Sequence, residues 1–120
     1  MDKTNRLRKN EDFKKVYKYG KSYYNRNLIM YIRKNDLEYS RIGFTVTKKI
    51  GNSVVRNKIR RRIKEIVRKN LGNIMDGYDI ILIPKKNVID ISFQELESAI
   101  FHIFKLANIL KNKNIGENNG

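Results

Sequence analysis

The sequence predicts an α+β fold, in which a mixed or antiparallel sheet of about four strands packs with three helices. Two kinds of segment indicate it, because stretches with helical spacing of apolar residues alternate with short apolar stretches that suit strands. The expected order is helix, strand, strand, one further strand of uncertain place, helix, strand, helix. With 120 residues and no cysteine, the chain can form one core without disulfides.

The first half of the chain predicts one helix and two strands. Asn10, followed by two acidic residues, suits the start of a helix, and Gly20 suits its end. Residues 27–33 and 41–47 have the composition of strands. The turn-like residues 34–36 between them predict that these two strands pair as an antiparallel hairpin.

The second half predicts a long basic helix, a buried strand and a final helix. Ser53 is the predicted N-cap of the basic helix. Residues 78–83 are almost all apolar, which predicts a central strand covered on both faces. Ser92 and Glu95 have the spacing of a capping box, and the helix that they open should run to about Leu110.

The domain organisation follows from the same patterns. We expect one α+β domain over residues 1–110 and a disordered tail over residues 111–120, which lacks apolar periodicity. No apolar run approaches the length of a membrane span, and the N-terminus has no apolar signal segment. The sequence therefore predicts a soluble cytoplasmic protein that has no membrane partner.

The positive charge of the chain is concentrated in one region. The net charge is +15. Residues 41–70 contain eleven Lys and Arg and one acid, a net charge of +10, whereas residues 71–110 carry −2. Such a local excess needs a polyanionic partner, and RNA or DNA is the obvious candidate. A membrane-surface helix would carry bulky aromatic residues on its apolar face, and this helix carries valine and isoleucine.

The basic helix has two different faces. At helical spacing, Val55, Ile59, Ile63 and Ile66 form a stripe that can pack on a core. The opposite face presents polar and basic side chains that can bind phosphate oxygens. These residues are Asn57, Arg60, Arg61, Lys64 and Arg68. A solvated charged face is the alternative for the arginines, and Asn57 suits a structural cap as well as an RNA contact.

A second group of residues suits unpaired nucleotides. Phe13 and Tyr17 share a face of the first helix, and Tyr31 lies in the strand that follows. Thr45 and Thr47 form the small polar side of the next strand. Aromatic rings beside small hydroxyl groups can stack on bases without reading their identity. From spacing alone, Phe13 and Tyr17 would more simply be core residues.

No catalytic or metal-binding constellation is visible in the sequence. His102 is the single histidine and lies in the last helix among apolar residues, which favours a structural role. The carboxylates of the second half are scattered, and no phosphate-binding glycine loop is present. We therefore predict no catalytic residue, no metal site, no cofactor and no small-molecule substrate in this chain.

The run KKIGNSVVRNKIRRRIKE, from Lys48 to Glu65, resembles the signature of the bacterial ribonuclease P protein subunit. That family shows a KKxGxAVxRN loop leading into a helix of the form RNRxKRxxRE. The segment NRLRKNEDF, residues 5–13, also resembles the family's N-terminal region. The similarity extends over about residues 4–108 and includes, in order, Gly20, Asn25-Arg26, Tyr31, Gly43 and Tyr78-Asp79-Ile80. Three positions depart conservatively from the pattern, namely Ser53, Lys58 and Lys64.

The resemblance implies a subunit of a ribonucleoprotein endoribonuclease that removes the 5′ leader from precursor tRNA. In that family the RNA partner performs the hydrolysis with bound Mg²⁺, and the protein improves substrate capture, so this chain alone should be inactive. The implied partners are the catalytic RNA and precursor tRNA. A ribosomal or other structural RNA-binding protein, and a DNA-binding regulator, remain as alternatives from charge and fold alone.

The resemblance also implies two sets of site residues. The residues implied to bind the catalytic RNA are Lys48, Lys49, Arg56, Asn57, Lys58, Arg60, Arg61, Lys64 and Arg68. The residues implied to line a cleft for the single-stranded leader are Phe13, Tyr17, Ile29, Tyr31, Thr45, Thr47 and Lys48.

Overall fold

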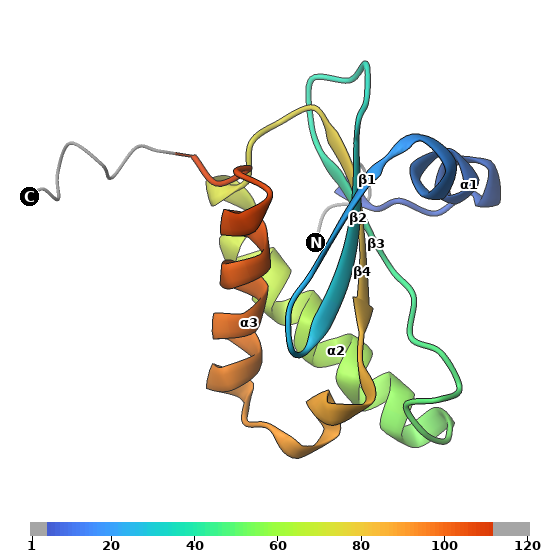
Figure 1. The fold of residues 1–120 in the computed structure, drawn as a ribbon, viewed down its shortest axis with the longest axis vertical. Helices are drawn as coiled ribbons and strands as arrows, with labels where there is room; N and C mark the ends of the chain where they lie inside the picture. Colours follow the sequence, from blue (N-terminus) through green and yellow to red (C-terminus); the bar gives the residue numbers. More distant parts are fainter. Residues whose placement is uncertain (1–4, 112–120) are drawn as a thin grey trace, which may run out of the picture.

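A four-stranded sheet with helices on both faces forms the structure, a computed structural model that describes residues 5–111. In chain order the elements are α1 (Asn10–Tyr19), β1 (Lys21–Tyr24), β2 (Leu28–Lys34), β3 (Arg41–Phe44), α2 (Ser53–Asn70), the 3-10 turn η2 (Leu71–Asn73), β4 (Tyr78–Pro84), the 3-10 turn η3 (Lys86–Asp90) and α3 (Phe93–Leu106). Figure 1 shows α1 on one side of the sheet and both α2 and α3 on the other. The predicted α+β class, with three helices and four strands, is confirmed. The predicted tail lies outside the described residues, apart from Lys111.

The strand order corrects one prediction from the sequence. The order in the sheet is β1-β2-β4-β3, so β4 lies between β2 and β3. The hairpin predicted between β2 and β3 is therefore wrong, because β2 pairs antiparallel with β4 and β3 pairs parallel with β4. Ile80 in β4 has Ile32 of β2 on one side and Ile42 of β3 on the other. The further strand is β1, which forms a hairpin with β2.

Local signals placed the helix starts to within a residue. Asn52, one position before the predicted Ser53, is the N-cap of α2, and its side chain accepts a hydrogen bond from the Val55 amide at 3.0 Å. The capping box of Ser92 and Glu95 at the start of α3 is confirmed. Helix α1 begins at Asn10 and ends before Gly20 as predicted, and Lys9, its N-cap, makes no side-chain cap bond.

Two predicted element ends lie earlier than expected. Helix α3 ends at Leu106 instead of about Leu110, and Asn108 adopts a left-handed conformation with φ of 58°. Leu110 then forms an isolated antiparallel bridge with Ile74, which closes the chain against the turn after α2. Strand β3 ends at Phe44, so Thr45 and Thr47 follow the strand instead of belonging to it.

The two faces of the sheet bury different cores. Because strand residues alternate between faces, Met30, Ile80 and Leu82 pack toward α2 and α3. Ile81, the neighbour of two of them in β4, packs instead on the α1 side with Val16. This burial on both faces confirms that β4 is a central strand, as its nearly continuous apolar sequence predicted.

An ion pair buried at the end of the sheet fixes α1 in place. Asp79 is 2% exposed and accepts hydrogen bonds from Arg41 Nε at 2.9 Å and Arg41 Nη2 at 2.7 Å. Asn35 Nδ2 also donates to Asp79, at 2.8 Å. Arg41 Nη1 reaches Asp12 of α1 at 3.2 Å. Hydrogen bonding to Asp79 raises the pKa of Arg41 above its ordinary value, so this guanidinium links β3, β4 and α1 as a permanent cation.

Candidate RNA-binding surfaces

The aromatic residues predicted for the leader cleft meet on the α1 side of the sheet. The rings of Tyr17 and Tyr31 lie with centroids 4.9 Å apart and planes at 76°, an edge-to-face contact. Tyr17 Oη is 3.0 Å from Thr45 Oγ1 and is hydrogen-bonded to it. Phe13 and Tyr31 pack at the edge of the small core under α1 and stay half-buried. Phe13 and Tyr31 therefore contribute to the core, whereas Tyr17 leaves aromatic surface open to a ligand.

A glycine makes the close approach of α1 to the sheet possible. A Cβ atom on Gly43 would lie 2.4 Å from Cζ of Phe13, which is shorter than atoms can approach. The absence of a side chain at Gly43 therefore lets the Phe13 ring lie on β3. Ile29 is half-buried on the same face of the sheet as Tyr31.

The remaining predicted cleft residues lie farther along the chain. Thr45 continues the pairing of β3, because its amide donates to the Leu82 carbonyl at 3.0 Å. Thr47 and Lys48 are exposed and follow in the loop that leads to α2. The structure thus gathers Phe13, Tyr17, Tyr31 and Thr45, and places Thr47 and Lys48 on the adjoining loop. We call these residues together with Ile29 the leader cleft.

Helix α2 has the two faces that its sequence predicts. Ile59, Ile63 and Ile66 are buried against the main core, joined by Val67. On the other face Lys58 and Arg61 are exposed, as is Lys49 in the loop before the helix, whereas Arg56, Arg60 and Lys64 are half-buried. Arg60 is therefore less exposed than Arg61, its neighbour on the predicted polar face. We call the polar and basic residues of this helix and of the loop before it the basic face.

Two arginines of the basic face are hydrogen-bonded to other side chains of α2. Asn57 does not cap the helix, and its Oδ1 accepts a bond from Arg60 Nη1 at 2.7 Å. Arg68 is bound to both oxygens of Glu65, with Nη2 to Oε2 at 2.7 Å. That bond lowers the pKa of Glu65. Within residues 5–111 this is the one ion pair on α2, so its other cations have no carboxylate partner.

Three arginines that the sequence pattern did not connect meet between the two surfaces. Arg6 and Arg8 of the N-terminal segment and Arg60 of α2 line a hollow of about 380 Å³, with Phe13 and Phe44 in its wall. The N-terminal segment reaches this place because Arg6 bridges Ile42 in parallel and extends the edge at β3. The hollow joins the leader cleft to the basic face. Arg60 was predicted from the sequence, whereas only the positive charge of residues 6–9 could have indicated Arg6 and Arg8.

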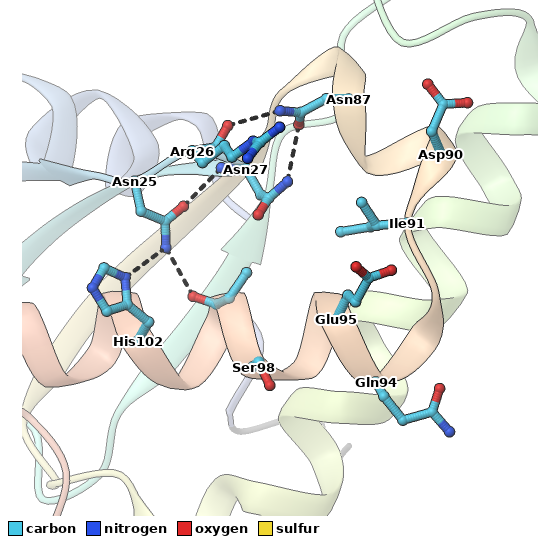
Figure 2. A pocket seen from close by; sticks show the side chains of 11 residues that line it. Asn25, Arg26, Asn27, Asn87, Asp90, Ile91, Gln94, Glu95, Ser98 and His102 are labelled. Atoms are coloured by element: carbon cyan, nitrogen blue, oxygen red, sulfur yellow. Dashed lines mark hydrogen bonds between the residues drawn. The ribbon is translucent and has the colours of Figure 1, made fainter.

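The histidine occupies a polar hollow on the other side of the sheet. His102 is exposed, which corrects the apolar setting expected for it, and its Nδ1 lies 3.2 Å from Asn25 Nδ2 (Figure 2). Asn25 Nδ2 also donates to the Ala99 carbonyl, at 2.9 Å. Asn25 Oδ1 accepts from the amides of Asn27 and Leu28. These bonds fix the β1–β2 turn to α3, which is a structural role for Asn25.

Neither a membrane-spanning helix nor a cluster of metal ligands is found among the described residues. No helix between residues 5 and 111 combines the length and apolar character that crossing a membrane requires. In the same part of the chain, no three His, Asp or Glu side chains converge where they could hold a metal ion. Asp79, the most buried carboxylate described, is committed to Arg41 and Asn35.

Comparison with known proteins decides which RNA-binding family has this arrangement. Residues 1–108 match the Ribonuclease P family. The chain belongs to the ribonuclease P protein family. It is 47% identical over 110 residues to the ribonuclease P protein component of Alkaliphilus oremlandii, a match that covers 92% of this chain and 96% of that one. The component from Finegoldia magna is 48% identical over 108 residues, covering 90% and 95% of the two chains.

Solved structures of ribonuclease P proteins have the same fold. The protein from Staphylococcus aureus superposes with a TM-score of 0.82 at 34% identity, over 89% of this chain and 98% of that one. The protein from Thermotoga maritima gives a TM-score of 0.78 at 36% identity, over 83% and 94%. Family membership confirms the resemblance found in the sequence. The chain is therefore a subunit of ribonuclease P, a ribonucleoprotein endoribonuclease of tRNA processing, and its partner is the ribonuclease P RNA.

Proposed function

We propose that this subunit binds the catalytic RNA through the basic face and the single-stranded 5′ leader of precursor tRNA through the leader cleft. One observation supports the pairing of these roles, namely the hollow that Arg6, Arg8 and Arg60 form between the two surfaces. A leader held in the cleft then lies beside arginines that can neutralise RNA phosphates. The complex would work in the cytoplasm.

The leader cleft suits a flexible strand better than a duplex. Tyr17 is 39% exposed, and its contact with Tyr31 fixes the angle between the two rings. The Thr45 hydroxyl is already bonded to Tyr17. Stacking on such rings accepts any base, because every base has a π face. The cleft would therefore favour precursors with a leader over mature tRNA, with little preference for leader sequence.

The basic face suits the phosphates of a folded RNA. Lys49, Lys58 and Arg61 are exposed, and Asn57 holds the guanidinium of Arg60 in one orientation. Arg68 must give up Glu65 to bind a phosphate, so we expect it to contribute less than Arg61. Arginine can donate two parallel bonds to a phosphate, and lysine supplies a point charge in the positions where it replaces arginine.

The chemistry itself would belong to the RNA. We expect the protein purified free of RNA to leave precursor tRNA intact, because its described carboxylates form no cluster that could hold catalytic metal ions. With its cognate catalytic RNA and Mg²⁺, the same preparation should give a product with a mature 5′ end. The assay compares protein alone, RNA alone and the complex at one Mg²⁺ concentration. Cleavage by protein alone after nuclease treatment would contradict the proposal.

Tyr31 is the best single probe of the leader cleft. Tyr31→Ala should weaken binding of precursors with several leader nucleotides to the assembled complex by about 1–3 kcal/mol, the value of one lost stacking platform. Precursors with a very short leader should bind as before. The measurement is the Kd of long-leader and short-leader precursors for wild-type and variant complexes.

Ile89→Ala offers a control for this experiment, because Ile89 is 39% exposed and lies outside the leader cleft. Ile89→Ala should leave the Kd of both the long-leader and the short-leader precursor unchanged. An equal loss for long and short leaders with Tyr31→Ala would show that Tyr31 acts only as a core residue.

A further inference from the structure

A third pocket lies apart from the leader cleft and the basic face. It has a volume of about 480 Å³ and opens where α1 passes into β1, beside the end of β2, the start of β4 and the residue after α3. Its lining residues are Tyr19, Lys21, Tyr23, Ile32, Arg33, Lys34, Tyr78 and Ala107. Three of these are tyrosines, three are cations and none is acidic. We call it the edge pocket.

Strand register places the edge pocket on the α3 side of the sheet. Lys21 pairs with Ile32 and Lys34 pairs with Tyr78, so these four residues share one face. Tyr23, two residues after Lys21, lies on that face too, and both Tyr23 and Tyr78 pack against the main core. The leader cleft uses the opposite face of the sheet. The two sites therefore cannot hold the same nucleotide.

The three tyrosines of the edge pocket differ in solvent exposure. Tyr23 and Tyr78 are half-buried and form a fixed wall, whereas Tyr19 is 65% exposed at the end of α1. The ammonium of Lys18 lies 5.3 Å from the centroid of the Tyr19 ring, which adds a fourth cation beside the opening. The pocket therefore offers a flat ligand an exposed ring and two half-buried ones.

We propose that the edge pocket binds one unpaired nucleotide of RNA. The base would stack against Tyr19, and the adjoining phosphate would lie near Lys21 and Lys34, which are exposed. A pocket of this volume falls within the range that accommodates small ligands. The three positive side chains of the lining disfavour a cationic ligand, and the tyrosines add an affinity for bases that a simple polyanion site does not need.

The first experiment tests whether the site exists. The full chain, labelled with ¹⁵N, is titrated with a single-stranded adenylate tetranucleotide and with an abasic ribose-phosphate oligomer of equal charge. The tetranucleotide should shift the amide signals of Tyr19, Lys21 and Tyr23, and Tyr19→Ala should weaken that binding by about fivefold or more. Tyr24→Ala is the matched control, since Tyr24 is 71% exposed in the same hairpin. This variant should bind the tetranucleotide with the wild-type affinity.

The second experiment identifies the RNA that supplies the nucleotide. The Kd of the Tyr19→Ala protein for catalytic RNA is compared with the Kd of its complex for a long-leader precursor. Loss in the first arm assigns the nucleotide to the catalytic RNA, and loss in the second assigns it to the precursor. The inference is overturned if the abasic oligomer binds equally well, or if neither arm changes. This test is independent of the leader cleft, because Tyr31→Ala reports on that site separately.

Discussion

Arg60→Ala combined with Arg61→Ala will weaken binding to the catalytic RNA by about tenfold or more, because each arginine can make charge-assisted bonds to phosphate. The dependence of log Kd on log salt should fall by about one for each lost phosphate contact, so by about two for the pair. The measurement is a series of binding isotherms at increasing salt, together with the melting temperature of each protein.

Two further variants decide how that result is interpreted. Arg61→Ala alone removes an exposed side chain, so its effect on RNA binding cannot come from the half-buried setting of Arg60. Arg68→Ala removes an arginine of the same helix that Glu65 already binds, and it should change RNA affinity much less. A lowered melting temperature with unchanged RNA affinity in the double variant would show that the basic face is structural.

Asp79→Ala will lower the free energy of unfolding by about 3–5 kcal/mol, the usual cost of removing one partner from a buried ion pair. The variant leaves Arg41 and Asn35 with donors that no longer have this acceptor. Because the pKa of Arg41 is raised, the contribution of that guanidinium is complete at neutral pH. It is lost only as strongly alkaline pH passes the raised pKa.

Asp12→Ala is the matched control for the buried ion pair. It removes the other carboxylate that contacts Arg41, at 3.2 Å, and this carboxylate is 20% exposed. A partly exposed pair of this kind contributes about 1 kcal/mol or less. Urea denaturation of both variants measures the difference. Equal losses for Asp12→Ala and Asp79→Ala would show that the buried pair has no special weight.

The sequence predicted what depends on residues close together in the chain. The capping box at Ser92 and the apolar stripe of α2 depend on spacings of three or four residues, so they were visible directly. Asn52 and Ser53 are both good caps, and only the direction of the chain entering α2 selects the first. The ion pair between Glu65 and Arg68 could also have been predicted, since the two residues are three positions apart on a helix.

Long-range pairing set the limit of prediction. The chain bends at residues 36–39, just after Lys34 ends β2, but nothing local shows that a strand more than forty residues later lies between β2 and β3. The same limit hid the hollow at Arg60, because Arg6 reaches it only through the bridge to Ile42. The basic face could be predicted from the charge of the sequence. The edge pocket depends on the register between β1, β2 and β4, which only the structure of the sheet shows.

The position of β4 has a consequence for biosynthesis. Translation delivers the chain from the N-terminus, and residues 78–84 form the strand that joins the β1–β2 hairpin to β3. Until they emerge, neither the β1–β2 hairpin nor β3 has its neighbour, and Tyr31 and Thr45 have no common sheet to bring them together. The basic residues of α2 emerge earlier. A growing chain therefore carries its most basic segment before it has a leader cleft, and selectivity for a substrate can arise only after β4 has been made.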